Sequence, residues 1–157
     1  MVMIMIKEIT DSEERKKITG QILNALPQWF GIPEAVQEYI QGCSGLPFWA
    51  AFEQENAVGF VARKTTSDTA AEIYVMGVIP QYHRNGIGRT LYAALEAGAK
   101  ADGIRYLHVK TIKMGCYPEY DRTNRFYQAM GFSALECIPW LWDEWNPCQI
   151  YVKYIGD

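Results

Sequence analysis

The chain has no apolar stretch that approaches the roughly 20 residues of a membrane-spanning helix. Its first residues, 1–6, are apolar, but no basic residue precedes them, and Lys7 and Glu8 follow at once. A signal peptide needs a basic start and a longer apolar core, so we interpret these residues as a first strand. The sequence therefore predicts no membrane partner and a cytoplasmic location.

Signals of metal binding are also scarce. The chain has only two histidines, His83 and His108. Its four cysteines, which show no C-x-x-C spacing, are Cys43, Cys116, Cys137 and Cys148. We expect no metal site from such a set. Four cysteines could form two disulfides, but without a secretion signal we interpret them as reduced thiols.

The chain lacks an excess of basic residues. Its 157 residues include 15 basic and 18 acidic side chains, for a formal charge of −3. A nucleic-acid-binding protein normally carries a basic face, so nucleic acid is not an expected partner. The hydrophobic fraction of 49% is typical of a globular chain. The length and the lack of repeats or linkers predict one domain that spans residues 1–157.

The chain is organised around one segment, residues 73–92. It opens as a β-branched apolar run typical of a buried strand, and Pro80 ends that strand because it has no N–H for the ladder. Gly86 and Gly88 allow a tight turn, and helical spacing begins at Ile87. A strand, a glycine turn and a helix start together predict an anion site, because free N–H groups and the helix dipole converge there.

Arg84 and Arg89 flank this turn and could bind a phosphate. The pattern alone leaves two readings open, a pyrophosphate cradle and an ordinary strand-to-helix turn. An NAD-type dinucleotide site is excluded, because it needs a third glycine where Leu91 stands. The sequence also has no Gly-x-x-x-x-Gly-Lys-Ser/Thr motif.

Hydrophobic periodicity and turn residues predict the other elements. We expect strands at residues 2–9, 48–52, 57–63, 72–79, 104–112, 132–138 and 149–154, and helices at 12–27, 33–41, 86–102 and 119–130. The second to fourth strands should form an antiparallel meander. The strand at 104–112 should lie parallel to the central strand, because a helical crossover joins them. Residues 139–147, rich in tryptophan, are expected to form a loop.

Two motifs stand out in this order of elements. The first is a Val-x-Pro strand end at residues 78–80, followed by a turn at residues 83–88 that fits [Arg/Gln]-x-x-Gly-x-[Gly/Ala], except that His83 stands at its first position. The second is Asn-x-Phe-Tyr-x-x-x-Gly-Phe at residues 124–132. Together they resemble the GNAT superfamily of acetyl-CoA-dependent N-acetyltransferases, whose late motif has one more residue before Phe-Tyr. The resemblance covers nearly the whole chain.

The resemblance implies an α/β (α+β) fold, with a mixed, mostly antiparallel central sheet of six to seven strands flanked by about four helices. It implies an enzyme that transfers the acetyl group of acetyl-CoA to a primary amine of a small molecule, by direct attack on the thioester in a ternary complex. The Val78 N–H would polarise the thioester carbonyl. The implied coenzyme-binding residues are Val78, Ile79, His83, Arg84, Asn85, Gly86, Ile87, Gly88, Arg89 and Asn124. We expect the histidine at position 83 to weaken phosphate binding little, because the turn binds phosphate mainly through backbone N–H groups.

Two residues match catalytic positions of the family. Tyr127 matches the general acid near the coenzyme sulfur; the alternative is a core tyrosine on an amphipathic helix. Glu72 stands eleven residues before His83, the spacing of a general base in several members, and burial would raise its pKa toward a useful range. The alternative for Glu72 is an outward-facing or salt-bridged residue, and other carboxylates, including Glu119 and Asp121, stay candidates. For Asn124, coenzyme contact and simple helix-surface polarity are both open.

The acceptor side in this family lies between the first helix pair and the late loops. Here those segments contribute Trp29, Phe30 and Trp142, with carboxylates at Asp143 and Glu144. Aromatic faces beside carboxylates suit an organic cation; the alternative is that these aromatics plug the core or form a homodimer surface. The acceptor itself stays open among polyamines, aminoglycosides, amino-acid-like metabolites and peptide amines. The rival function is a non-catalytic acyl-CoA-binding regulatory module.

Overall fold

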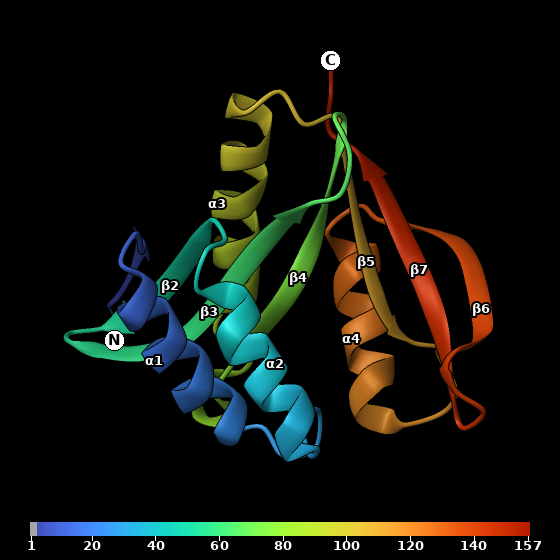
Figure 1. Cartoon of the computed structure of the whole chain (residues 1–157), viewed down its shortest axis with the longest axis horizontal. Coiled ribbons are helices and arrows are strands. Elements are labelled where there is room, and N and C mark those ends of the chain that lie inside the picture. Colours follow the sequence, from blue (N-terminus) through green and yellow to red (C-terminus); the bar gives the residue numbers. More distant parts are fainter. Residues whose placement is uncertain (1–2) are drawn as a thin grey trace.

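The computed structural model describes residues 3–157 and shows four α-helices packed on one seven-stranded sheet (Figure 1). The strands are β1 (Ile4–Glu8), β2 (Phe48–Glu53), β3 (Asn56–Thr65), β4 (Ala70–Val78), β5 (Tyr106–Ile112), β6 (Ser133–Asp143) and β7 (Asn146–Tyr154). The helices are α1 (Ser12–Asn24), α2 (Pro33–Cys43), α3 (Ile87–Ala101) and α4 (Pro118–Ala129), with a 3₁₀ turn at Pro80–Tyr82. The predicted fold class is confirmed. Val2, expected in the first strand, lies outside the described residues.

The sheet has the strand order β1-β2-β3-β4-β5-β7-β6, and all neighbouring strands are antiparallel except β4 and β5. The parallel pairing of β4 and β5 covers only residues 70–72 against residues 106–108. Beyond these pairs the two strands diverge, as Figure 1 shows. The predicted meander and the predicted parallel crossover are both confirmed.

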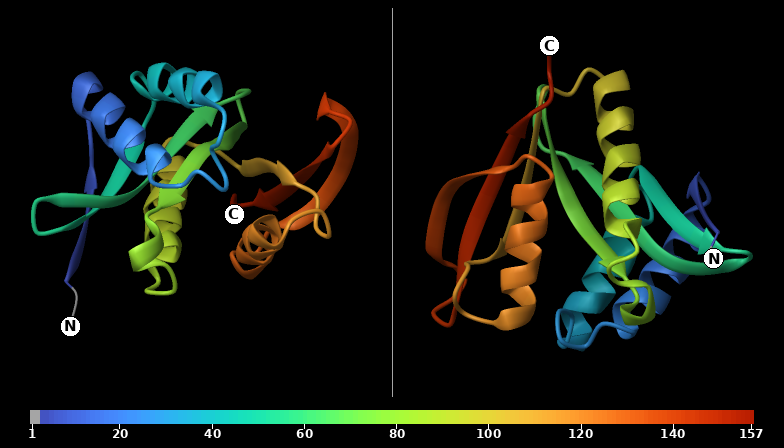
Figure 2. Two further views of the ribbon diagram at one scale, coloured as in Figure 1. Left: turned by 90° about the horizontal axis from the view of Figure 1, so that it is seen from below. Right: turned by 180° about the vertical axis from the view of Figure 1, so that it is seen from behind.

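Helices cover both faces of the sheet. Figure 2 shows α1 and α2 on one face and α3 and α4 on the other. One core, under α1 and α2, includes Leu23 and Phe60, and a second core, under α3 and α4, includes Leu91 and Leu107. These four side chains are fully buried, and each such burial stabilises the fold by about 1.5–3 kcal/mol. The second core also contains Val109 of β5 and Tyr127 of α4, so it joins the elements on both sides of the divergence.

The prediction of a loop at residues 139–147 is wrong. β6 continues to Asp143 and β7 begins at Asn146, so this segment is the tip of a hairpin. Tryptophan favours strands, and Pro139 is tolerated because β6 is an edge strand. The Asp143 carboxylate closes the turn by accepting hydrogen bonds from the Trp145 and Asn146 backbone N–H groups, each at 2.9 Å.

None of the helices in the described part of the chain is both long and apolar enough to span a membrane.

Candidate active site

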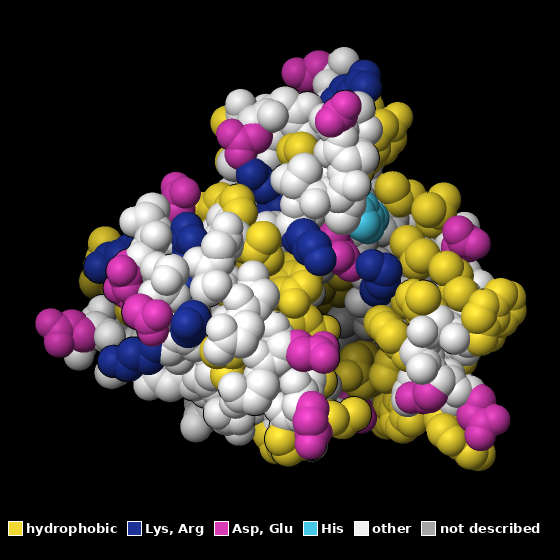
Figure 3. All heavy atoms as spheres, in the orientation of Figure 1, with side chains coloured by type: hydrophobic (Ala, Val, Ile, Leu, Met, Phe, Trp, Pro, Cys, Tyr) yellow, Lys and Arg dark blue, Asp and Glu magenta, His cyan; other side chains and the backbone are white. Residues whose placement is uncertain are grey.

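A cleft of about 800 Å³ opens where β4 and β5 diverge. Its walls come from these strands, the N-terminal end of α3, helix α4, the segment between α1 and α2, and the tip of the β6–β7 hairpin. Figure 3 shows the surface hollowed between the α1–α2 side and the hairpin side, with hydrophobic side chains along the hollow.

The strand edge of β4 that faces the cleft carries backbone groups without a strand partner. Ile79 N donates to Val58 O at 2.9 Å, which places Ile79 in the β3 ladder. Successive residues of an antiparallel strand point their backbone groups to opposite edges, so Val78 and Met76 point theirs away from β3. No β5 residue pairs with β4 at this level. The Val78 N–H is thus directed where the sequence analysis required it.

The glycine turn lies at the mouth of the same cleft. Gly86 is the N-cap of α3 with φ of +75°, in the left-handed region that glycine adopts without strain. No side chain caps this helix, so its first N–H groups stay available to an anion. Arg84 and Arg89 are exposed, line the cleft, and form no ion pair within residues 3–157. These features fit the pyrophosphate of a coenzyme.

The second glycine of the turn has a packing role. A Cβ on Gly88 would lie 3.2 Å from the ring of Phe126, so glycine lets α3 approach α4 closely. Gly88 and Ile87 both line the cleft. Asn85, in contrast, is exposed and is not among the lining residues, and neither is Ile79.

His83 connects the turn to two other walls. Its Nε2 lies 2.6 Å from Val78 O, and because a carbonyl oxygen only accepts, Nε2 carries the proton. The ring also meets Trp29 edge to face, with 5.9 Å between centroids. The unusual residue of the motif thus fixes the end of β4 against the α1–α2 segment.

Tyr127 lines the cleft from α4 and is 6% exposed. Burial raises the pKa of its phenol well above the value in water, so the hydroxyl is neutral and keeps its proton. Thr111 lines the same region from β5, and its buried Oγ1 has no hydrogen-bond partner in the described part of the chain. No sequence pattern pointed to Thr111, because a buried hydroxyl without a partner is a property of the folded chain.

Glu72 and Asn124, like Ile79 and Asn85, do not line the cleft. The Glu72 side chain is 13% exposed, and its Oε2 accepts from Lys110 Nζ at 2.7 Å, which is the salt-bridged alternative that the sequence left open. Asn124 is fully buried. Its amide donates to Ile112 O and Tyr120 O at 2.8 and 2.7 Å, so neither coenzyme contact nor surface polarity describes it. Asn124 instead fastens α4 to the end of β5.

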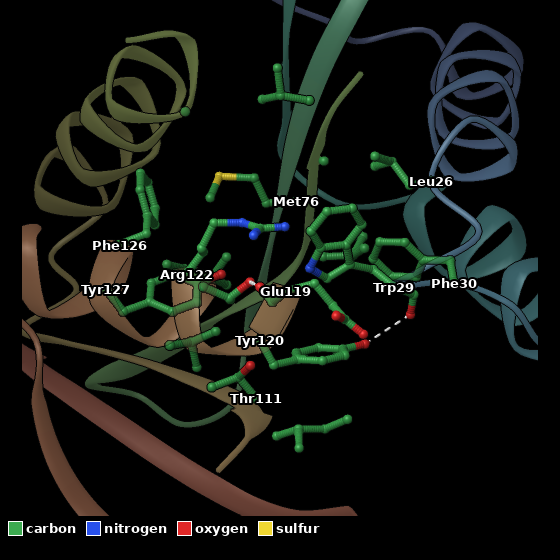
Figure 4. Close-up of a pocket in the computed structure, with 18 of the residues that line it drawn as sticks. Leu26, Trp29, Phe30, Met76, Thr111, Glu119, Tyr120, Arg122, Phe126 and Tyr127 are labelled. Carbon is green, nitrogen blue, oxygen red and sulfur yellow. Dashed lines mark hydrogen bonds between the residues drawn. The ribbon is translucent and has the colours of Figure 1, made fainter. Parts of the chain in front are cut away.

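The cleft is also lined by Trp29, Phe30, Glu119, Tyr120, Trp142 and Asp143, and we call this set the acceptor half because it contains the three residues that the sequence predicts for the acceptor. Figure 4 shows Glu119 and Tyr120 extending from α4 toward Trp29 and Phe30. The Tyr120 hydroxyl donates to Trp29 O at 2.9 Å and so fixes the α1–α2 segment to α4. The structure thus brings the three predicted acceptor residues together.

Helical spacing contained the signal for the α4 wall. Glu119, Thr123 and Tyr127 are four residues apart and share one face of α4. All three line the cleft. Starting from Tyr127, this spacing would have selected Glu119 from among the carboxylates that the sequence left open.

Comparisons with known proteins agree with this geometry. The sequence model of the acetyltransferase (GNAT) family matches residues 16–132. A structure described as a GNAT-family acetyltransferase from Desulfovibrio desulfuricans superposes with a TM-score of 0.83 at 20% identity, covering 98% of this chain and 99% of that one. An aminoglycoside 6'-N-acetyltransferase complexed with coenzyme A gives 0.80 at 18% identity, covering 96% and 97%. The ribosomal-protein-S18-alanine N-acetyltransferase from Escherichia coli gives 0.79 at 15%, covering 99% and 96%. No curated protein matches the sequence.

The splayed sheet, the uncapped helix and the family match define an acyltransferase. The chain belongs to the GNAT family of acetyltransferases. At identities of 15–20% the structural neighbours establish the fold only. Across residues 3–157, no group of three His, Cys, Asp or Glu side chains could hold a metal ion.

Proposed function

We propose that this protein transfers the acetyl group of acetyl-CoA to a primary amine of a small molecule, by direct attack on the thioester while both substrates are bound. The observation that carries the proposal is the joint placement of three groups on one cleft. These are the open edge of β4 at Val78, the uncapped start of α3 at Gly86, and the neutral phenol of Tyr127.

The donor would lie along the left wall of Figure 4, between α3 and α4. The first N–H groups of α3 and the guanidinium groups of Arg84 and Arg89 would bind its pyrophosphate. Its pantetheine amides would pair with the unpaired edge of β4, as an added strand does.

The reaction balances with groups that this chain supplies. The amine nitrogen attacks the thioester carbonyl carbon, a C–N bond forms, and the C–S bond breaks. The Val78 N–H stabilises the negative charge that develops on the carbonyl oxygen. The leaving thiolate takes a proton from Tyr127, and the amine gives one to a general base.

Glu119 and Glu72 are the two candidates for that base. Glu119 lines the acceptor half, and its carboxylate forms no hydrogen bond or ion pair within the described residues. Glu72 is occupied by Lys110 and could serve only after Lys110 releases it. We therefore favour Glu119. Comparing the pH–rate profiles of Glu119→Gln and Glu72→Gln decides between them, because only loss of the base removes the acidic limb.

Calorimetric titration with acetyl-CoA, with NADH as control, tests the donor half. A screen for thiol release with primary amines then tests transfer. Micromolar acetyl-CoA affinity with amine-dependent release of CoA supports the enzyme. Tight binding without release from any amine would instead support the regulatory module that the sequence left open.

A further inference from the structure

The acceptor half offers few negative charges to a bound amine. Two carboxylates line the cleft, those of Glu119 and Asp143. Both oxygens of Asp143 accept from neutral donors of the hairpin turn, with Asn146 Nδ2 at 2.9 and 3.0 Å, so this carboxylate keeps its charge but is held in the turn. Glu119 is therefore the one lining carboxylate that forms no such bond within residues 3–157.

Positive charge is more abundant in the same cleft. Arg122 lines it from α4 and forms no ion pair within the described residues. Figure 4 shows the Arg122 side chain extending into the cleft above Glu119. Lys110 also lines the cleft and is already neutralised by Glu72. A ligand with several ammonium groups would lose hydration here and find only two carboxylates, with the Arg122 guanidinium in the same cleft.

Aromatic side chains supply most of the remaining surface. Trp29, Phe30 and Tyr120 stand together in Figure 4, and Trp142 adds a further face from the hairpin tip. Trp142 is 47% exposed, so part of its ring is available to a ligand. Aromatic walls bind planar apolar groups by stacking and a single ammonium group through their faces.

We infer that the acceptor is a monoamine, in which one primary amine is joined to an aromatic body, and that polycationic amines are disfavoured. Glu119 receives the ammonium group, and Trp29, Tyr120 and Trp142 enclose the body. The inference rests on the proposed function. It separates this chain from the aminoglycoside acetyltransferase whose fold it shares, because charge in the cleft, and not the fold, selects the acceptor.

The test compares kcat/KM of the wild-type protein for four amines, from thiol release at saturating acetyl-CoA. The amines are 2-phenylethylamine, spermidine, kanamycin and a short peptide with a free N-terminus. We expect a value for 2-phenylethylamine at least about tenfold above the others, the loss that one unpaired buried charge produces. Equal or better turnover of a polycation or of the peptide overturns the inference while leaving the acetyltransferase proposal intact. If acetyl-CoA binds and no amine is turned over, the proposed function fails, and the inference falls with it.

Two variants test the walls and the charge separately. Trp142→Ala should raise KM for 2-phenylethylamine about fivefold, with unchanged acetyl-CoA affinity. Trp140→Ala is the matched control, because Trp140 lies on the same strand, is 79% exposed and does not line the cleft.

Ala35→Glu adds a carboxylate to the cleft in the first turn of α2, where the helix dipole stabilises a negative charge. It should raise the ratio of kcat/KM for spermidine to kcat/KM for 2-phenylethylamine about threefold. The inference is contradicted if both variants are active but Trp142→Ala leaves KM unchanged and Ala35→Glu leaves this ratio unchanged.

Discussion

The phenol of Tyr127 is enclosed by apolar side chains, and this burial raises its pKa far above that of a tyrosine in water. The group is therefore protonated across the pH range in which the enzyme would work. A thiol is a stronger acid than this phenol, so the raised pKa keeps Tyr127 protonated but does not by itself drive proton transfer to the leaving thiolate; the general-acid role rests on the position of Tyr127 in the cleft.

Tyr127→Phe should lower kcat about 100-fold while leaving acetyl-CoA affinity within about twofold, because the ring is retained and only the proton donor is lost. The control is Tyr92→Phe. Tyr92 is equally buried, but it donates to Glu96 and does not line the cleft. Steady-state kinetics on both variants would exclude a general acid at Tyr127 if kcat fell equally in the two.

The cysteines should differ sharply in reactivity. Burial raises the pKa of Cys43 to about 11, and its side chain is fully covered. Cys116 is exposed. Because only a thiolate reacts, iodoacetamide at pH 8 should label Cys116 in the native protein and Cys43 only after unfolding. Peptide mass mapping checks this, and native labelling of Cys43 at the rate of Cys116 would contradict the described packing.

At the scale of residues, motif spacing selected Tyr127 and turn residues that line the cleft, Asn85 excepted, but it did not predict the positions of Glu72 and Asn124. Both are polar residues in apolar surroundings, and such residues either face a wet cleft or find a buried partner. Lys110 and the carbonyl of Ile112 are those partners. Each partner lies on β5. The sequence predicts that β5 lies beside β4, but it does not predict which β5 residues contact Glu72 and Asn124.

At the scale of elements, the start of α3 depends on the conformation of Gly86. Gly86→Ala should destabilise the fold by about 1–2 kcal/mol, because alanine is strained at φ of +75°. It should also weaken acetyl-CoA binding at least about tenfold by disturbing the free N–H groups. Gly103→Ala is the matched control, since Gly103 has φ of +80° beyond the other end of α3. Calorimetry should find equal losses of stability and a loss of affinity only in Gly86→Ala.

A polar contact ties α3 to β7. Lys153 Nζ donates to Glu96 Oε1 at 2.7 Å and to Met130 O at 2.8 Å. Burial raises the pKa of Glu96, but the bonds from Lys153 and Tyr92 outweigh it and hold the pKa below its ordinary value. A lowered carboxyl pKa stabilises the fold above the unfolded pKa of about 4.3, and this stability is lost as pH falls through the folded pKa.

Glu96→Gln should therefore lower the free energy of unfolding by about 1–2 kcal/mol at pH 7, with the difference shrinking below about pH 4. Urea denaturation across this range measures it. Glu13→Gln should have almost no effect, because Glu13 pairs with Lys16 at the surface with its side chain 79% exposed. A Glu96→Gln deficit that persists undiminished at pH 3 would rule out the ion pair as its cause.

Element types were predictable because their periodicity is local, as in β2 to β4 and α3. The hairpin tip was not. Pro139 and Pro147 normally mark loops, but β6 is an edge strand, where the missing N–H groups break no central ladder. Edge position is a property of the whole sheet, so no local pattern could have shown that Trp142 sits on a strand.

At the scale of the molecule, the site exists because β4 and β5 pair over only three residues and then separate. Helices cover both faces of the sheet, and the segment before α2 and the end of β6 line the acceptor half of the cleft. The sequence motifs predict the strand end, the glycine turn and the late helix of this arrangement one by one. The combination of Glu119, Arg122 and several aromatic faces in one cleft appears only when distant segments meet.

The most direct test of the account is acetyl-CoA-dependent CoA release by the wild-type protein, measured with and without 2-phenylethylamine. The account predicts amine-dependent release that is saturable in both substrates and is reduced about 100-fold by Tyr127→Phe. Release that does not depend on a primary amine would contradict the claim that this cleft performs acetyl transfer to an amine, and amine-dependent release that survives Tyr127→Phe unchanged would contradict the general-acid role of Tyr127.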